Sequence, residues 1–446
     1  MDKNQKFELR RETERTILYL RLKQGVNTVF SELLNLTIMM GYLLGVVLIL
    51  VSTRTFGFEI VGIDLPNEIY SPIWAVIFFS YLGICLFLFF LVAGTPLGGK
   101  RIANNLRRSG PVNQAGEPPI LLAKRKSEDN PRVTVMEFAA NAIPLSAFLD
   151  KIGDIEAALD VHVMKITEGS SKRRILLYVV LAKYHLPKTL YWRNEYLSMK
   201  NFVLVLGENL LGKVTVNLAR IPHILLGGST GSGKTKLLQL LLLQCILKGA
   251  RVILADFKGG ADFGKIWRKR CEFVCDEDTL IIVLRKIVNE LDRRKIVLSR
   301  CECADIDEYN QRYKAKMQRI IFACDEVGAL LSKTGASKEQ KEKIALIEGY
   351  LTTIACLGRS FGITLILATQ RPDMDTLPGK VKSVIDCRVC GRASNVLSMI
   401  ILDNTSANEQ IPKDSQGLFI MHDGTLFQAY LFDEEYAFDS TSDNQL

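Results

Sequence analysis

The sequence predicts a mixed α/β protein whose largest domain is built on a parallel sheet, preceded by a small α+β domain and two transmembrane helices. Two observations lead to this prediction. From Asn201 onward, short charge-poor apolar segments alternate with longer helical patterns, which is typical of parallel strands covered by helices on both faces. Near the N-terminus, residues 33–53 and 73–93 form two uncharged runs that are long enough to cross a bilayer.

Composition limits the class of protein. The 446 residues are 48% hydrophobic and 24% charged, with ordinary amounts of glycine and proline, which excludes a disordered or collagen-like chain. The length leaves room for roughly two or three domains. The formal net charge of +9 is compatible with nucleic acid or an anionic membrane as a partner and does not choose between them.

The basic N-terminal region, residues 1–31, precedes a predicted hairpin of two transmembrane helices over residues 32–94. Each uncharged run covers roughly 30 Å as a helix, about one bilayer core. Two buried helices of a soluble domain are the alternative, but such helices seldom lack every charge over this length. Lys and Arg crowd both flanks, whereas the connecting segment 54–69 holds one base. The positive-inside rule therefore predicts a two-span cell-membrane protein with both termini in the cytoplasm.

The cytoplasmic part divides by composition. Residues 95–130 are rich in Gly, Pro, Asn and basic side chains and predict a juxtamembrane linker. Residues 131–200 combine the strand-like VTVMEF and ILLYVVLA with the amphipathic LSAFLDKIGDIEAAL, which predicts a small α+β domain. Residues 201–436 are predicted to form the larger α/β domain, and residues 437–446 a polar tail.

A phosphate-binding loop is predicted at residues 228–235. GSTGSGKT fits G-x-x-x-x-G-K-[ST] between the strand-like HILLGG and a helical segment, the context that the motif requires. The glycines let backbone N–H groups point at phosphate oxygens, the lysine reaches the β- and γ-phosphates, and the final hydroxyl ligates Mg²⁺. The candidate ATP-binding residues are Gly228, Ser229, Thr230, Gly231, Ser232, Gly233, Lys234 and Thr235, with Thr235 as a metal ligand. A chance Gly/Ser-rich turn is the alternative.

A second half of the same site is predicted where other apolar strands end. RIIFAC is followed by Asp325, expected to hold Mg²⁺ through water, and by Glu326, expected to orient and polarise the attacking water. Gln370 follows ITLILAT and is expected to contact the γ-phosphate or the water in the same crevice. Glu326, Lys234 and Gln370 are therefore the catalytic candidates. For Gln370, an ordinary strand-end turn is the alternative.

Other residue groups give less specific signals. Four arginines are candidates for a charge supplied to the ATP of a neighbouring subunit, and spacing selects none of them: Arg359, Arg371, Arg388 and Arg392. Six lysines are candidates to line a DNA pore, although a solvated helix face is the simpler interpretation of the first four: Lys333, Lys338, Lys341, Lys343, Lys380 and Lys382. Cys387 and Cys390 have zinc-site spacing, but their apolar run favours reduced, buried thiols.

Taken together, the motifs resemble those of the FtsK/SpoIIIE-type DNA translocases over roughly residues 200–435. GENLLGKVTVNLARIPHILLGGSTGSGKT resembles the family's lead-in and Walker A loop. Asp256-Phe-Lys258, Asp325-Glu326 and RSFGITLILATQRP follow in the family's order, and GRASNVLSMIILD and DSQGLFIM resemble its later motifs. The resemblance implies a RecA-like P-loop ATPase that uses ATP and Mg²⁺, forms a homo-hexamer and moves DNA without sequence preference.

The layout also resembles one branch of that family more than another. Members dedicated to chromosome segregation usually have four spans, a long linker and a C-terminal winged helix. With two spans and a short linker, this chain looks like the coupling ATPases of Gram-positive integrative conjugative elements, which implies a relaxase and conjugation channel proteins as partners. A segregation-type translocase, a protein-secretion ATPase of the same motor family and a non-enzymatic scaffold are the alternatives.

Overall fold

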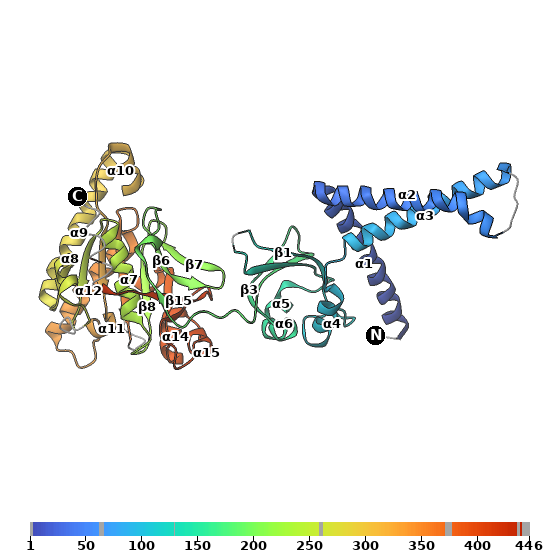
Figure 1. Ribbon diagram of the computed structural model, residues 1–446. Coiled ribbons are helices and arrows are strands. Elements are labelled where there is room, and N and C mark those ends of the chain that lie inside the picture. Colours follow the sequence, from blue (N-terminus) through green and yellow to red (C-terminus); the bar gives the residue numbers. More distant parts are fainter. Residues whose placement is uncertain are drawn as a thin grey trace. The chain divides into compact units, whose positions relative to one another are not determined.

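The computed structural model describes residues 3–61, 67–128, 130–257, 262–370, 377–434 and 438. The chain divides into two compact units, Met1–His185 and Leu186–Leu446. The prediction of an α/β fold with a parallel sheet, preceded by two apolar helices, is confirmed (Figure 1).

Three long helices open the first unit: α1 (Lys3–Ser31), α2 (Leu33–Val61) and α3 (Asn67–Ala93). Leu33–Ser52 of α2 and Ser71–Ala93 of α3 are long and apolar enough to cross a membrane, and only 17% and 6% of their most apolar stretches are buried. The sequence predicted a connecting segment over 54–69, but α2 continues to Val61 and α3 already begins at Asn67, with Pro72 inside the helix.

Helix α1 packs against α3 through two facing glycines. A methyl group added to Gly25 would come within 1.9 Å of the Phe90 carbonyl oxygen, and one added to Gly94 within 1.9 Å of the Arg21 carbonyl oxygen. Because only glycine allows backbones to approach this closely, Gly25 and Gly94 fix where α1 crosses the end of α3.

A four-stranded antiparallel sheet follows in the order β1-β2-β4-β3, covered by short helices. Its elements are α4 (Gly99–Ser109), β1 (Ile120–Lys126), β2 (Val133–Ala139), α5 (Leu145–Leu149), α6 (Ile152–Leu159), β3 (Val161–Glu168) and β4 (Arg174–Leu181). The core contains Leu106, Phe138, Phe148 and Ile155.

The predicted linker over 95–130 is wrong, because α4 and β1 belong to this domain. Helix α4 turns Ile102 and Leu106, one helical turn apart, onto the core. Asn105 also donates a hydrogen bond to the Ala158 carbonyl at 2.9 Å. The single helix expected in LSAFLDKIGDIEAAL is instead two, α5 and α6, interrupted at Asp150 and Lys151.

The second unit contains one large mixed sheet in the order β10-β9-β11-β12-β8-β13-β14-β15-β6-β7, with β5 paired to β15. Its strands are β5 (Leu190–Tyr191), β6 (Val203–Asn209), β7 (Gly212–Asn217), β8 (Ile224–Gly227), β9 (Arg251–Ala255), β10 (Glu272–Val274), β11 (Ile320–Cys324), β12 (Ile363–Thr369), β13 (Cys387–Cys390), β14 (Leu418–Met421) and β15 (Leu426–Leu431). The first six strands in the sheet order pair in parallel, and the later strands of that order pair antiparallel. Strand β5 pairs with β15 in parallel.

Helices cover both faces of this sheet (Figure 1). They are α7 (Lys234–Leu247), α8 (Lys265–Arg270), α9 (Glu277–Arg300), α10 (Ile306–Tyr313), α11 (Val327–Leu330), α12 (Lys338–Leu357), α13 (Gly379–Ser383), α14 (Asn395–Leu402) and α15 (Ser406–Gln410), with a 3₁₀ turn at Asn194–Tyr196. Alternate strand residues serve the two layers: Leu226 packs in the cluster with α7, and Leu225 in the cluster with α9 and α12.

The boundary between the units lies at His185, not at residue 200 as the sequence predicted. Strand β5 joins the edge of β15, and the Trp192 ring packs against Tyr430 and Tyr196 at centroid distances of 5.8 and 6.2 Å. Residues 186–200 therefore belong to the larger unit, because they complete its aromatic packing.

Strand register brings the polar strand ends together. In β11, Cys324 pairs with Ala255 of β9 and Leu367 of β12, and Thr369 of β12 pairs with Gly227 of β8. Because parallel strands end at one edge of the sheet, the loops after these four strands meet there.

Candidate functional site

The loop of residues 228–235 lies between β8 and α7, where the backbone turns sharply. Gly231 and Gly233 have φ angles of 77° and 96°, a conformation that glycine adopts without strain. A methyl group on Gly233 would lie 3.1 Å from the Gly417 backbone nitrogen. The last two residues of the loop, Lys234 and Thr235, are the first two of α7, so the loop lies at the N-terminus of this helix, which is a favourable place for phosphate.

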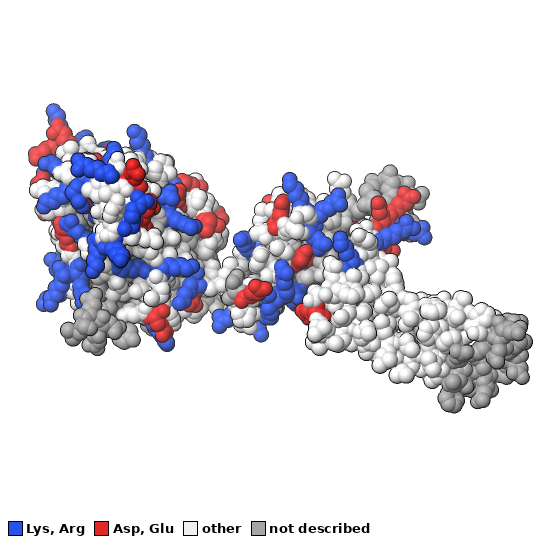
Figure 2. Space-filling model, turned by 90° about the horizontal axis from the view of Figure 1, so that it is seen from above, with Lys and Arg blue, Asp and Glu red and all other residues white. Residues whose placement is uncertain are grey.

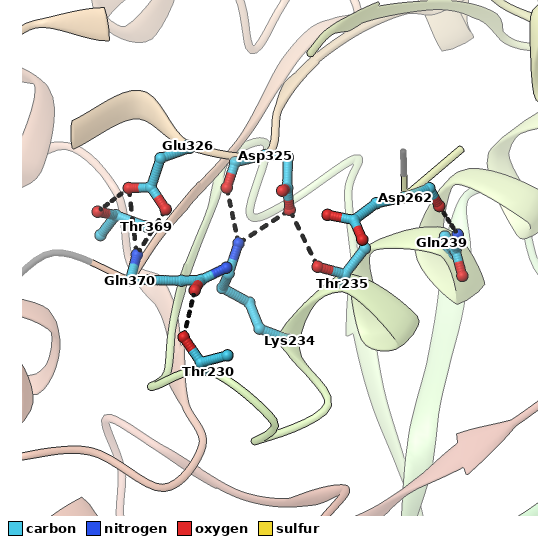
Figure 3. Close-up of polar contacts among 9 residues, drawn as sticks. All are labelled: Thr230, Lys234, Thr235, Gln239, Asp262, Asp325, Glu326, Thr369 and Gln370. Carbon is cyan, nitrogen blue, oxygen red and sulfur yellow. Dashed lines mark hydrogen bonds and ion pairs between the residues drawn. The ribbon is translucent and has the colours of Figure 1, made fainter. Parts of the chain in front are cut away.

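Lys234 and Asp325 form a buried ion pair below this loop. The Lys234 Nζ donates hydrogen bonds to Oδ1 of Asp325 at 2.8 Å and to its backbone carbonyl at 2.6 Å (Figure 3). The two side chains are 2% and 1% exposed. The Thr235 hydroxyl donates to the same carboxylate at 3.3 Å. The strand-end acid that follows β11 is therefore in direct contact with the phosphate loop.

Glu326 turns toward the end of β12 (Figure 3). Its carboxylate accepts a hydrogen bond from the Thr369 hydroxyl at 2.8 Å and from the Gln370 backbone N–H at 3.1 and 3.2 Å. The Gln370 side chain accepts a hydrogen bond from the Thr230 hydroxyl at 3.0 Å. Gln370 thus links the phosphate loop to the strand-end carboxylate through its own side chain and backbone.

A cavity of about 490 Å³ opens beside the loop. Its lining includes Lys234, Thr235 and Gln370 together with Lys236, Asp262 and Glu434. A cavity of this size is within the range that holds cofactors. All the site residues that the sequence predicted lie in this region, and the roles assigned to them stay predictions.

Sequence reasoning missed several residues of the site. Thr369 lies inside the quoted ATQRP string, yet nothing in the string marks its hydroxyl as the partner of Glu326. Glu434 comes from the chain's C-terminal region and bonds the Lys236 ammonium at 3.1 Å and the Trp267 indole N–H at 3.0 Å. Gln239, on α7, donates to the Asp262 carbonyl at 2.6 Å. These partners are distant in sequence, so no local pattern signals them.

The four candidate arginines have different surroundings. Arg392 donates to the Thr230 carbonyl of its own phosphate loop at 2.7 Å. Arg388 is paired with Asp403 and bonds the Ile385 carbonyl at 2.8 Å. Arg359 is exposed and precedes the start of β12, at the sheet edge opposite the loop. Arg371 lies outside the described residues.

Three of the six candidate lysines form ion pairs with acids on the same unit. Lys333 pairs with Glu348 at 2.8 Å, Lys343 with Asp278 at 2.8 Å, and Lys382 with Asp403 at 2.7 Å. These contacts favour a solvated surface role for the three paired lysines. Of the Asp256-Phe-Lys258 motif, Asp256 is buried at the end of β9, and Lys258 lies outside the described residues.

The donor set fits a magnesium nucleotide. Backbone N–H groups and Lys234 are phosphate ligands, whereas the Thr235 hydroxyl and the Asp325 carboxylate are hard oxygen ligands of the kind that Mg²⁺ prefers. The nearby Cys324 thiol does not compete, because burial raises its pKa to about 12 and keeps it protonated. Burial likewise raises the pKa values of Cys387 and Cys390, in β13, to about 12.

Comparison with known proteins places this site in a family. The model of the FtsK/SpoIIIE family matches residues 188–345. The DNA translocase FtsK of Caldanaerobacter subterraneus subsp. tengcongensis is 30% identical over 217 residues, 47% of this chain and 29% of that protein. The DNA translocase SftA of Bacillus subtilis is 29% identical over 229 residues, 48% of this chain and 23% of that protein. The matches thus span less than a third of these curated relatives.

One solved structure is similar over a larger share of the chain. The conjugation coupling protein TcpA of pCW3, in its monomer form with ATPgS, is 30% identical and superposes with a TM-score of 0.56. The match covers 76% of this chain and 96% of that chain. Because so much of that protein is matched at this identity, the similarity extends beyond the phosphate-binding core.

Proposed function

The chain belongs to the FtsK/SpoIIIE family and carries its ATPase domain, and from that premise we propose that it is an ATP-driven DNA translocase anchored in the cell membrane. The observation that carries the proposal is the 30% identity to the conjugation coupling protein TcpA over 96% of that chain. The phosphate loop and the strand-end acids of this chain, which lie in contact, support the ATPase part.

The proposed reaction transfers the γ-phosphoryl group of ATP to water. Lys234 exchanges its contacts with Asp325 for phosphate oxygens and neutralises part of their charge. Glu326 accepts a proton from the attacking water, while Thr369 and the Gln370 backbone hold its carboxylate in place. Mg²⁺, when bound by Thr235 and through water by Asp325, supplies further charge neutralisation. Gln370, which already contacts Thr230, reports phosphate occupancy to Glu326.

DNA is the proposed substrate because two relatives are named DNA translocases. A motor that grips the phosphate backbone binds without sequence preference and loses affinity steeply as salt rises. The chain's net charge of +9 is consistent with binding to a polyanion such as DNA. The active assembly in this proposal is a homo-hexamer, in which a neighbouring subunit supplies an arginine to each nucleotide site.

The anchor in this proposal consists of α2 and α3. Few residues of their apolar stretches are buried in the chain by itself, and the visible face of that region carries no charged side chain (Figure 2). So large an apolar surface is costly in water and is stabilised when lipid surrounds it. Basic residues on both flanks favour the orientation with both termini in the cytoplasm.

The biological step in the proposal is conjugation. The coupling-protein relative favours a role in which the motor delivers relaxase-bound DNA to a conjugative secretion channel. A chromosome-segregation translocase is the second candidate, favoured by the curated relatives named FtsK. Transfer assays separate the two roles, since only the first predicts loss of plasmid or element transfer with normal division.

The direct test measures ATP turnover by the full chain in lipid nanodiscs. We expect linear DNA of unrelated sequences to raise the rate, and the increase to vanish as salt rises. Glu326→Gln should lower turnover about 100-fold or more while retaining nucleotide binding. If DNA leaves the rate of ATP turnover by the wild-type chain unchanged, the translocase proposal is refuted. In cells that carry the gene, normal DNA transfer by Lys234→Ala would refute the conjugative role.

A further inference from the structure

A second cavity, of about 310 Å³, lies in the first unit where α1, α4 and the segment before β1 meet. Two helical stripes form its walls: Thr13, Ile17 and Arg21 on α1, and Lys100, Ala103 and Arg107 on α4. The α1 residues are spaced four apart, and the α4 residues three and then four apart, which places each set on one face of its helix. Thr95, Gly99 and the segment from Glu117 to Leu121 complete the lining.

Packing on either side fixes these walls. The Gly25–Gly94 crossing holds α1 against the end of α3, and the Arg21 guanidinium donates to the Gly94 carbonyl at 3.3 Å. On α4, Ile102 and Leu106 face the domain core, so Lys100 and Arg107 lie on another face of the helix. The fold therefore fixes the backbone positions of the basic stripe, while the Lys100 and Arg107 side chains are exposed.

The cavity has an unbalanced charge, and one of its lining residues has a carboxylate oxygen with no hydrogen-bond partner among the described residues. Arg21, Lys100 and Arg107 line it together with a single acid, Glu117. Glu117 is 7% exposed, and its Oε2 is buried without a hydrogen-bond partner among the described residues. Partial burial lowers the pKa of Arg21, but a guanidinium stays protonated at neutral pH. The set favours a ligand that is anionic overall and also donates a hydrogen bond to a carboxylate.

The cavity begins immediately beyond the second apolar stretch. That stretch ends at Ala93, and Thr95 is already part of the lining. With both stretches in a bilayer, this depth coincides with the headgroup layer, which is several ångströms thick on each side of the hydrocarbon core. Ile17, Pro118, Ile120 and Leu121 add apolar wall surface next to the charges.

From these observations we propose that the cavity binds the headgroup of an anionic phospholipid with free hydroxyls, of the phosphatidylglycerol type. Its phosphodiester contacts Arg21, Lys100 and Arg107, and a glycerol hydroxyl donates to Glu117. The proposal rests on the membrane anchoring proposed above. It gives the motor a lipid contact at the point where its anchor joins the α+β domain.

Lipid fits this cavity better than two other sources of phosphate. A DNA duplex is too wide for a cavity of this volume, and the apolar wall residues contribute nothing to a DNA backbone contact. A soluble phosphate satisfies the cations but leaves the apolar wall uncovered. Basic residues next to a membrane span are a common means of recognising anionic lipid.

The test compares two double variants of α4 with equal loss of charge. Lys100→Gln/Arg107→Gln removes cavity residues, whereas Arg101→Gln/Arg108→Gln removes neighbours that are equally exposed and do not line the cavity. The full chain in detergent is titrated with phosphatidylglycerol and phosphatidylcholine, and bound lipid is counted by native mass spectrometry. We expect phosphatidylglycerol affinity to fall about 10-fold or more in the first variant and to change little in the second.

A third variant tests the role of the acid. Glu117→Leu removes the hydroxyl acceptor and a negative charge, so a purely electrostatic site would bind phosphatidylglycerol more tightly. Phosphatidic acid lacks the headgroup glycerol and its hydroxyls. We therefore expect the wild-type chain to prefer phosphatidylglycerol over phosphatidic acid, and Glu117→Leu to lose this preference. Retention of that preference in Glu117→Leu would overturn the assignment of the headgroup hydroxyl.

Three outcomes would overturn the lipid site itself. Equal losses of phosphatidylglycerol affinity in the two α4 variants would mean that the lipid is attracted by the basic surface in general and not by the cavity. Full competition by soluble glycerophosphate would mean a free phosphate site, and full competition by a DNA oligonucleotide would mean a nucleic-acid site. Extraction of membranes with carbonate tests the anchor separately. A chain that stays in the membrane but shows no difference between the α4 variants refutes this proposal alone.

Discussion

The carboxylate of Glu326, at the end of β11, accepts a hydrogen bond of 2.8 Å from the hydroxyl of Thr369, at the end of β12. The two strands are neighbours in the sheet, and their parallel register brings these ends together. The same carboxylate also accepts the Gln370 backbone N–H. Two donors therefore fix the orientation of a carboxylate that is proposed to act on the attacking water.

Replacing Thr369 with valine removes one of these donors and keeps the side-chain shape. We expect the kcat for ATP to fall about 10- to 100-fold with little change in KM, because a misplaced catalytic group slows the reaction step without weakening nucleotide binding. Steady-state turnover of the full chain measures both constants. Thr369→Ser, which keeps the hydroxyl, should recover most of the rate; equal losses in the two variants would contradict a positioning role.

Lys234→Ala is expected to destabilise the nucleotide-free protein as well as to abolish ATP binding. The substitution leaves the Asp325 carboxylate buried without its cation, and breaking a buried pair in this way costs about 3–5 kcal/mol. Thermal unfolding followed by the fluorescence of the buried Trp192 and Trp267 reports on this unit.

Two further variants check this explanation of the Lys234→Ala effect. Lys234→Ala/Asp325→Asn removes the stranded charge and should regain part of the lost stability. Lys236→Ala breaks a partly exposed ion pair with Glu434 and should cost no more than about 1 kcal/mol. A double variant as unstable as Lys234→Ala would show that the buried charge is not the cause.

Local sequence signals predicted the part of the site that depends on local structure. The phosphate loop and the acids after β11 each follow an apolar strand, so the chain around them predicts both conformation and chemistry. Thr369 and Glu434 escaped prediction because their partners, Glu326 and Lys236, are brought near only by sheet register and by packing of the C-terminal region. Helix α4 was not predicted because its two apolar residues that pack on the core, the buried Leu106 and the partly buried Ile102, stand among polar and basic side chains.

Arg294 connects α9 to the starts of two central strands. Its guanidinium donates to the Phe361 carbonyl at 2.7 Å and the Gln318 carbonyl at 2.8 Å, and the side chain is 4% exposed. Arg294→Met should destabilise the unit by about 3 kcal/mol, because both carbonyls lose a charged donor. Arg293→Met is a matched control, since that exposed neighbour bonds only Glu290 among the described contacts. Similar unfolding temperatures for the two variants would contradict a stabilising role of the Arg294 hydrogen bonds to these carbonyls.

His223 precedes β8 and is held in its neutral form. Its Nδ1 accepts the Leu365 backbone N–H at 3.0 Å, so its Nε2 carries the proton that bonds the Ala355 carbonyl at 3.0 Å. Burial lowers the pKa of His223 to about 4, against a smaller opposing effect of the Ala355 carbonyl. A proton on Nδ1 would face the Leu365 backbone N–H, which is also a donor. The folded protein therefore disfavours the protonated form of His223.

The pH dependence of stability follows from this depressed pKa. Between pH 6.5 and about 4 the unfolded chain binds a proton at His223 that the folded chain does not, so stability falls as the pH is lowered through this window. The loss from this group approaches about 3 kcal/mol at pH 4. His223→Gln offers an acceptor and a donor without titrating, and its unfolding temperature should fall less between pH 7 and 4.5 than that of the wild type. The exposed His422→Gln is the control and should follow the wild-type curve. Parallel curves for wild type and His223→Gln would mean that His223 does not set this acid sensitivity.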